Sequence, residues 1–202
     1  MHREKKFLQD HTETPHRLRP LPPLDTMSSK DPVLKYVASV LLDTARSIPA
    51  GETPRGKAMW VPVIGGHIKA ANGTAIASIL PGGGGDYITL HVEDRVLELD
   101  IRTVAQDDQG TLFRLATSGF FHLDEATMRR LLQDDEGAAK AGLSKLNIQE
   151  FGGFDAFEVF SCNTSSVRYR WMNFATLIGQ ARFVLGPEGV QGVEHRLFQV
   201  TY

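Results

Sequence analysis

The stretch TAIASILPGGGGDYITLHVEDRVLELDIRTV, residues 74–104, contains three short segments rich in β-branched and aliphatic residues. Two turn signals separate them, Pro81 to Gly85 and Glu93-Asp94. Segments of this composition are typical of strands. Strands joined by such short turns must be antiparallel neighbours, because a parallel crossover needs about a dozen residues or more. The stretch therefore predicts an antiparallel meander.

Comparable segments continue through the chain from residue 33 onward. Further strands are expected at 33–42, 58–63, 66–70, 111–121, 156–162, 169–185 and 194–202. The Asn72-Gly73 pair between two of them is typical of a type I′ hairpin, in which both central residues take positive φ. About nine strands in hairpin order indicate an all-β fold, either a closed barrel or a sandwich.

Three parts of the chain depart from the strand pattern. Residues 1–31 are rich in proline and charge and lack apolar periodicity, so we expect an irregular N-terminal extension before a β domain at 32–202. Residues 123–132 have acidic side chains in the first turn and arginines in the last, which complements a helix dipole and predicts one short helix. The polar residues 134–153 are expected to form a loop or a broken second helix at the rim.

The composition argues against several classes of protein. The 202 residues contain 24 acidic and 22 basic side chains, a formal charge of −2, which argues against a nucleic-acid partner. No apolar run approaches the roughly 20 residues that a membrane-spanning helix needs. The charged N-terminus lacks the apolar core of a signal peptide. We therefore expect a cytoplasmic protein that binds a small molecule rather than nucleic acid or a membrane.

Cysteine, histidine and glycine patterns contain no metal or cofactor motif. The single cysteine, Cys162, cannot form an internal disulfide, and its strand context predicts a structural role. The seven histidines lack metal-ligand spacing. Gly82–Gly85 invites comparison with a phosphate-binding loop, but neither a Lys-Ser/Thr pair nor a helix follows it. We expect no metal and no cofactor, and we interpret these glycines as a turn leading to Asp86.

Alternation within segment 95–104 proposes a first group of candidate residues, because residues two apart in a strand share a face. Glu98, Asp100 and Arg102 lie on one face, and the opposite face is aliphatic. The charged face is either exposed to solvent, which is the usual place for charge, or it lines the barrel interior with acid–base groups.

Two other strand faces carry candidate residues. Asp86 heads an otherwise apolar face, so it lies at a rim or is buried. A buried carboxylate without a partner has a raised pKa, which is how general bases are made. Tyr169, Trp171 and Asn173 share a face that is either ordinary core packing or a wall for a flat ligand.

These motifs, in this order, resemble the family catalogued as domain of unknown function 3237, over residues 33–202. The matching segments are Gly51 to Gly56, Pro62 to Gly66, Pro81 to Asp86, Leu99 to Arg102, and Tyr169 to Asn173 with Gly179. This chain departs from the family pattern in having Tyr87 for tryptophan, Met172 for leucine, the additional glycines Gly84 and Gly85, and a longer segment at 134–153.

The resemblance implies a single antiparallel up-and-down β-barrel of about 8–10 strands with a central cavity. It also implies a cofactor-independent isomerase or cyclase role in secondary metabolism, including ring closure like that of chalcone isomerase. Under this resemblance the shared motif positions would converge on one cavity, which favours the interior placement of Asp100 and Arg102. These positions are Asp86, Asp100, Arg102, Tyr169, Trp171 and Asn173.

Two functions follow as alternatives. The first is an isomerase, cyclase or lyase acting on an aromatic or polyketide-like small molecule. In it Asp100 or Asp86 would transfer a proton and Arg102 would stabilise developing charge. Substrate binding would fall to Tyr169, Trp171, Asn173 and Arg55. The second function is a non-catalytic binding or carrier barrel, in the manner of lipocalins. A structural module with a filled interior is a third reading, and a homodimer or higher homo-oligomer is compatible with each.

Overall fold

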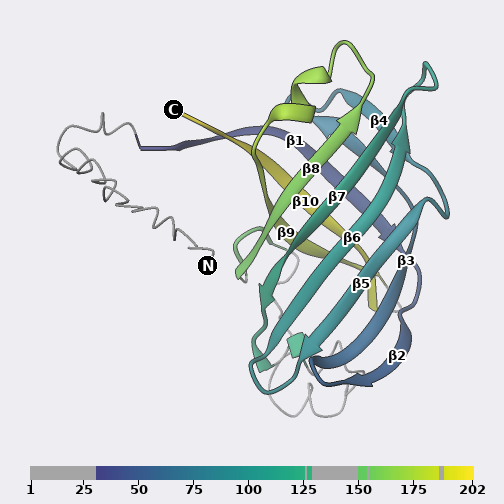
Figure 1. Ribbon diagram of the computed structural model, residues 1–202, viewed down its shortest axis with the longest axis vertical. Coiled ribbons are helices and arrows are strands. Elements are labelled where there is room, and N and C mark those ends of the chain that lie inside the picture. The colour runs from purple at the N-terminus through teal and green to yellow at the C-terminus, as the bar shows by residue number, and fades with distance from the viewer. Residues whose placement is uncertain (1–30, 126, 129–149, 154, 187–188) are drawn as a thin grey trace, which may run out of the picture. The chain divides into compact units, whose positions relative to one another are not determined.

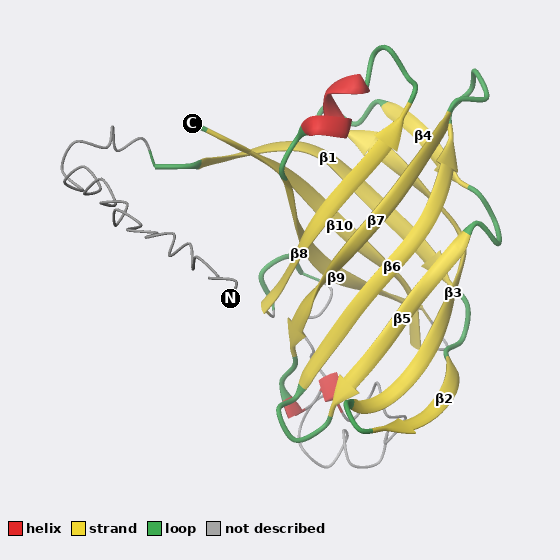
Figure 2. Cartoon of the chain, in the orientation of Figure 1, coloured by secondary structure: helices red, strands yellow, loops and turns green. Residues whose placement is uncertain are grey.

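The computed structural model describes residues 31–125, 127–128, 150–153, 155–186 and 189–202. These residues form ten strands and one 3₁₀ helix, η3 (Figures 1 and 2). The strands are β1 Val33–Thr44, β2 Ile48–Thr53, β3 Gly56–Ala70, β4 Ala75–Ile79, β5 Gly84–His91, β6 Val96–Gln106, β7 Leu112–His122, β8 Asp155–Thr164, β9 Leu177–Gly186 and β10 Gly189–Thr201; η3 spans Arg170–Phe174.

The strands close into a barrel. β1 pairs with β10 on one side and with β3 on the other. From β10 the neighbours follow as β9, β8, β7 and β6. β4 and β5 share one position between β3 and β6. Every pairing is antiparallel, so the predicted all-β barrel is confirmed and the sandwich is not formed.

The strands around β3 differ from the prediction. The segments expected at 58–63 and 66–70 form one continuous strand, whose two halves pair with β5 and β4 in turn. A Cβ atom on Gly66, where φ is 124°, would lie 2.0 Å from the carbonyl oxygen of Leu41 in β1, so this glycine allows the two backbones to meet.

β2 was not predicted, because its sequence IPAGET has no apolar alternation and all six residues are exposed.

The hairpin between β3 and β4 is present but is not type I′. Gly73 has a φ of 84°, whereas Asn72 does not take positive φ. The Asn72 side chain accepts a hydrogen bond from the backbone N–H of Thr74 at 3.1 Å. This local bond stabilises the turn with one left-handed residue instead of two.

The segment predicted as a strand at 169–185 divides into η3 and β9. Residues three apart lie on the same side of a 3₁₀ helix, and this spacing turns Tyr169 and Met172 together toward the core. The Met172 N–H donates to the Tyr169 carbonyl at 3.0 Å. The strand prediction for 169–174 is therefore wrong. The alternating pattern of side chains indicated a strand, but a 3₁₀ turn is what buries Tyr169 and Met172 together.

The predicted helix and the predicted extension fall largely on residues that the structure does not describe. Glu125, Thr127 and Met128 are helical. Asp124 caps this turn, since its Oδ1 accepts from the Thr127 N–H at 2.6 Å. The remainder of the helix, residues 1–30 and residues 134–149 lie outside the described residues.

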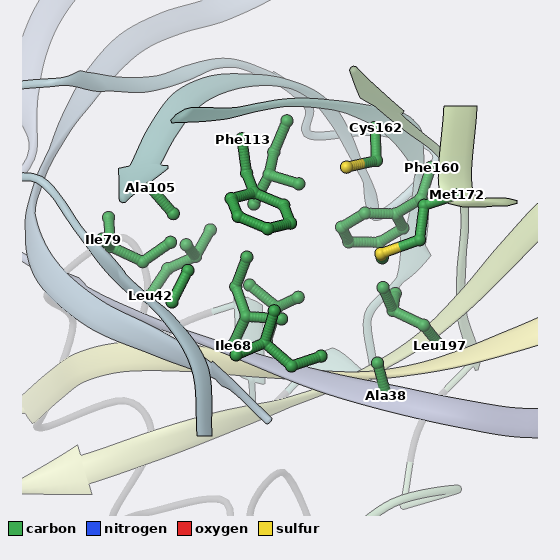
Figure 3. Packing of buried hydrophobic residues seen from close by; sticks show 14 of the residues in the cluster. Ala38, Leu42, Ile68, Ile79, Ala105, Phe113, Phe160, Cys162, Met172 and Leu197 are labelled. Atoms are coloured by element: carbon green, nitrogen blue, oxygen red, sulfur yellow. The ribbon is translucent and has the colours of Figure 1, made fainter. Parts of the chain in front are cut away.

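Two apolar clusters fill the barrel interior. The first surrounds Phe113, Ile68 and Phe160, whose side chains point toward one another together with Met172 and Leu197 (Figure 3). The second contains Leu90, Leu97, Leu99, Phe121, Ala156 and Phe183. Burial of these side chains supplies most of the driving force for folding. The interior-facing residues that belong to neither cluster are mainly polar.

Candidate functional site

A layer of buried polar side chains lies at the boundary between the two apolar clusters. On β7, Thr117 stands between Leu115 of the first cluster and Phe121 of the second. On β8, Glu158 stands between Phe160 and Ala156 in the same way. The polar layer consists of Asp86, Thr103, Thr117, Glu158 and His195, whose exposed fractions are 7%, 3%, 4%, 2% and 0%.

Glu158 is the centre of the polar layer. Its Oε2 accepts a hydrogen bond from the Thr117 hydroxyl at 3.2 Å, and it lies 2.9 Å from Nδ1 of His195. The second contact is close enough for an ion pair but out of line for a hydrogen bond. Glu158 Oε1, His195 Nε2 and Thr103 Oγ1 have no hydrogen-bond partner in the described part of the chain. Buried polar atoms without partners are costly, and they call for a bound ligand or water.

Two glycines make room for the Glu158 side chain. Gly119 on β7 and Gly179 on β9 are its register partners on either side. A Cβ atom on Gly119 would lie 2.8 Å from Glu158 Cγ, and one on Gly179 would lie 2.4 Å from the Phe160 ring. Both distances are too short for real atoms. Gly119 therefore leaves room for the Glu158 side chain and Gly179 for the neighbouring Phe160 ring, while Glu158 reaches over β9 to His195 on β10.

Asp86 supplies a second carboxyl group to the polar layer. The pKa of Asp86 is raised to about 8. Burial is the main cause, the nearby charges of Glu158 and Asp100 add to it, and the backbone N–H of Asp100, which donates to Oδ1 at 3.1 Å, partly offsets it. Asp86 is therefore mostly a neutral carboxylic acid at pH 7. The sequence left open whether Asp86 lies at a rim or is buried, and the structure has it buried on the face of Leu90.

Asp100 and Arg102 do not line the interior. Their side chains are 48% and 65% exposed, and they pair with each other at 2.8 Å on the outer face of β6. The inner face of β6 is taken by Leu97, Leu99 and Ile101, because burying aliphatic side chains is favourable and burying charge is not. The interior placement of this pair was wrong, and the solvent-exposed alternative is correct.

The remaining predicted residues do not converge on the polar layer either. Arg55 lies on the outer surface, where it donates to both carboxylate oxygens of Glu98 at 2.8 and 2.9 Å. Tyr169 packs edge-on against Phe113 in the first cluster, with ring centroids 5.9 Å apart. Trp171 is 38% exposed.

Asn173 has a structural task at the end of β8. Its Oδ1 accepts from the Thr164 N–H at 2.8 Å, and its Nδ2 donates to the Thr164 carbonyl at 2.9 Å. Both polar ends of the amide are thus used by backbone. The predicted convergence of six residues on one cavity is therefore wrong for all but Asp86, because η3 breaks the alternation that would have aligned Asn173 with Tyr169 and Trp171.

A hollow of about 480 Å³ borders the same strands on their outer side. Its walls include the outward-facing Ser118, Phe120, Phe157 and Val159, and Gly119 lies at its floor. Its lining also includes Leu99 and Glu158, which are buried residues of the inner faces. The hollow is therefore not separate from the polar layer, and the central cavity stays a prediction.

A comparison with protein families gives a match over residues 32–200 to the profile described as protein of unknown function, DUF3237. The chain belongs to the DUF3237 family. This membership was predicted from the ordered glycine, proline and acidic motifs, and it is confirmed. The match begins at the first described strand and extends almost to the C-terminus, so the polar layer lies wholly within the DUF3237 region.

Individual relatives support the same fold. The chain is 29% identical over 182 residues to PR-toxin biosynthesis cluster protein 7 of Penicillium roqueforti, covering 83% of this chain and 92% of that protein. It is similar in structure to a conserved protein of unknown function from Rhodopseudomonas palustris (TM-score 0.67, 18% identity, 86% and 100% of the two chains). It is also similar to a β-barrel-like protein from Acinetobacter baumannii (TM-score 0.61, 20% identity, 87% and 99%).

Sequence reasoning missed four members of this DUF3237 polar layer, namely Thr103, Thr117, Glu158 and His195. His195 alternates with Val193 and Leu197, opposite Glu194 and Arg196, so a histidine in an apolar phase was visible in β10. Glu158 was hidden, because the exposed Phe157 and Val159 make the outer face of β8 look like the core face.

Two further findings concern the described residues as a whole. No helix among them has the length and apolar character to cross a membrane. Within the same ranges, no three His, Cys, Asp or Glu side chains are grouped in a way that could hold a metal ion.

Proposed function

We propose that this chain is an enzyme that transfers protons to and from a small molecule held inside the barrel, as an isomerase, cyclase or lyase of secondary metabolism. The observation that carries the proposal is the burial of Asp86, a carboxylic acid with a raised pKa, within electrostatic reach of the Glu158–His195 pair. Asp86 holds a proton at neutral pH, and Nε2 of His195 is a nitrogen without a hydrogen-bond partner in the described part of the chain. Acid–base catalysis needs two such groups.

The roles follow from the contacts of each side chain. Glu158 lies against Nδ1 of His195, which leaves Nε2 of the ring to accept a proton from substrate. The edge of the His195 ring is held by Phe160, with centroids 5.1 Å apart at 69°. Asp86 donates a proton where charge develops on the substrate. The residues that bind the reacting atoms would therefore be Asp86, Glu158 and His195.

Ring closure onto an unsaturated ketone illustrates the chemistry. His195 takes the proton of a substrate hydroxyl as its oxygen forms a bond to the β-carbon. The π electrons of the C=C bond move to the carbonyl oxygen, and Asp86 then protonates the α-carbon of the resulting enolate. Return of the proton from His195 to Asp86 restores the enzyme. The product is an isomer of the substrate, so no co-reactant is consumed.

Two observations support the assignment to secondary metabolism and to a largely apolar substrate. The relative in Penicillium roqueforti is named for a toxin biosynthesis cluster, and it aligns over 92% of its length. The polar layer is bounded by apolar clusters that contain Phe113, Phe121 and Phe183. Such walls suit an aromatic or polyketide-like skeleton with a few polar groups. These phenylalanines, rather than the partly exposed Trp171, would contact the substrate skeleton.

The test is proton exchange in heavy water. The protein is incubated with 2′-hydroxychalcone in D₂O, and the flavanone formed is analysed for yield, enantiomeric excess and deuterium at the α-carbon, against a protein-free reaction. Asp86→Asn and His195→Asn are expected to lower the protein-dependent rate by about 10²- to 10⁴-fold. Arg102→Ala, on the outer face, is the matched control and should keep the wild-type rate.

Binding without turnover would identify the carrier function instead. In that outcome the wild-type protein retains the chalcone in equilibrium dialysis but does not increase flavanone formation or deuterium exchange, on this probe and on a panel of hydroxylated enones. The proposal is also lost if Asp86→Asn and His195→Asn both keep full activity.

A further inference from the structure

The interior of the described barrel carries acidic groups but no lysine or arginine. Its buried polar residues are Asp86, Thr103, Thr117, Thr127, Thr164, Glu158 and His195. His195 is the one residue among them that can carry a positive charge, and it lies 2.9 Å from Glu158. A carboxylate at this distance would neutralise any positive charge that the ring acquires, so the pair leaves no positive charge for a third group.

Three arginines of the described barrel form ion pairs on its outer surface. Arg102 pairs with Asp100 and Arg55 pairs with Glu98, with the two guanidinium groups 65% and 72% exposed. Arg182 pairs with Glu194 on β10, whose neighbour His195 faces inward. Because adjacent residues in a strand face opposite sides, the Arg182–Glu194 pair is on the outer face.

From these contacts we infer that the barrel selects an uncharged ligand that carries both a hydroxyl group and a carbonyl group, and that it rejects carboxylates and phosphate esters. The inference rests on the proposed function in placing the ligand at the polar layer. It goes further in naming the chemical class that this layer accepts, and it applies equally to a barrel that binds without catalysis.

The hydrogen-bonding inventory of the polar layer matches such a ligand. Glu158 Oε1 is an unpartnered acceptor, and it suits a ligand hydroxyl. The Thr103 hydroxyl is an unpartnered donor, and the protonated Asp86 is another, so both suit a ligand carbonyl. Thr103 lies two residues along β6 from Ile101, the register partner of Asp86, which places these two donors on neighbouring strands.

An anionic ligand is disfavoured both by its hydrogen-bonding groups and by its charge. Its carboxylate or phosphate group offers only acceptors, so this group cannot satisfy Glu158 Oε1, which needs a donor. Its charge would also be buried beside the Glu158 carboxylate with no free cation, and an uncompensated buried charge is strongly unfavourable. The apolar clusters on either side of the polar layer add no solvation for that charge.

The test compares two probes that share a skeleton. 1-Hydroxy-2-acetonaphthone is a neutral hydroxy-ketone, and 1-hydroxy-2-naphthoate carries a carboxylate in place of the acetyl group. Binding of each to the full chain is measured by equilibrium dialysis at pH 7. The hydroxy-ketone should bind at least roughly 100-fold more tightly than the naphthoate.

Glu158→Gln provides the second arm, because it removes the negative charge while keeping the shape. It should narrow the preference between the probes by roughly tenfold or more, chiefly by improving naphthoate binding. Glu98→Gln, an outer-face carboxylate, is the matched control and should leave the preference unchanged. Thermal melting of both variants checks that they are folded.

The outcomes separate this inference from the proposed function. Equal affinity for the two probes, or no binding of the hydroxy-ketone, overturns the inference even if deuterium exchange occurs. Selective binding of the hydroxy-ketone without any exchange supports the inference and counts against the enzyme. An unchanged preference in folded Glu158→Gln shows that Glu158 does not exclude anions and overturns the stated cause.

Discussion

Nδ1 of His195 lies 2.9 Å from Oε2 of Glu158, and both side chains are sealed from solvent inside the barrel. These residues are 37 positions apart in the chain. The contact crosses β9, which separates their strands, next to Gly179, whose missing side chain leaves room for the Phe160 ring. Burying such a pair costs free energy of desolvation. Removing one partner costs more, because the other group is then buried without its counter-ion.

Glu158→Ala should destabilise the protein by about 3–5 kcal/mol, because it leaves His195 buried without its partner. The double variant Glu158→Ala, His195→Ala should lose less than the sum of the two single changes. Urea unfolding followed by circular dichroism measures the free energies. Glu194→Ala, which breaks the partly exposed pair with Arg182, is the comparison and should cost at most about 1 kcal/mol. Additive single effects would show that Glu158 and His195 are not coupled.

Asp86 should make the protein less stable as the pH rises. Its folded-state pKa of about 8 lies above the ordinary aspartate pKa of 3.8, so the folded protein binds this proton more tightly than the unfolded chain does. The contribution of Asp86 to stability is therefore complete below about pH 4, and it is lost as the pH rises through 8, with a slope of about 1.4 kcal/mol per pH unit between those values.

Asp86→Asn removes the titrating carboxyl group, so the free energy of unfolding of this variant should depend less on pH between about 4 and 8. Urea unfolding of the two proteins at pH 6 and at pH 9 measures the difference. The asparagine variant should gain stability relative to the wild type at pH 9 compared with pH 6. An unchanged difference between the proteins at the two pH values contradicts the raised pKa of Asp86.

Gly179→Ala should disturb the polar layer, since the added methyl would lie 2.4 Å from the Phe160 ring. Overpacking of this kind costs about 1–3 kcal/mol. It should also lower chalcone cyclisation, because Phe160 contacts the His195 ring. Gly65→Ala is the control, with a Cβ atom at an ordinary 3.5 Å from Asp43. Thermal melting and the cyclisation rate are measured for both variants. Equal effects of Gly179→Ala and Gly65→Ala would show that the close packing at Gly179 is not needed for stability or turnover.

The outer-face pair of Asp100 and Arg102 should contribute little. Both side chains are well exposed, so Asp100→Asn and Arg102→Ala should each change stability by at most about 1 kcal/mol. Neither change should abolish turnover or alter ligand preference. A loss of activity as large as that of Asp86→Asn, with the fold intact by circular dichroism, would return these residues to the active site.

Cys162 should be unreactive in the folded protein. Burial raises the pKa of its thiol to about 11, so almost no thiolate is present at pH 7.5. Its reaction with 5,5′-dithiobis(2-nitrobenzoate), followed at 412 nm, should be slow in buffer and fast in urea. Rapid labelling of the native protein would contradict both the burial and the structural role predicted for this residue.

The antiparallel strands and the family could be predicted from the sequence because their signals are local, and the choice of a barrel over a sandwich came from the family resemblance. Alternation in 95–104 and the short turns around Pro81–Gly85 need only a few neighbouring residues to be recognised. Asp86 was found for the same reason, as a lone acid at the head of an apolar face. The errors come where distant contacts prevail. Tyr169 and Trp171 alternate like a strand, but burial of Met172 coils that segment into η3.

The face assignments show the limit most clearly. The charged row of β6 is equally compatible with interior and exterior until the whole ring of strands is closed. On β8 the local pattern even favours the wrong face, since Phe157 and Val159 are more apolar than Ala156 and Glu158.

By itself, the sequence of this protein determined a chain of antiparallel strands, its family with the barrel that the family implies, and one acid at the head of an apolar face, because each depends on residues close together in the chain. Only the tertiary structure decided which chemistry the interior holds. Asp86, Glu158 and His195 come from strands β5, β8 and β10, and the closure and register of the barrel bring them into one layer. The same closure directs Asp100 and Arg102 outward, since one face of every strand must be apolar to fill the core.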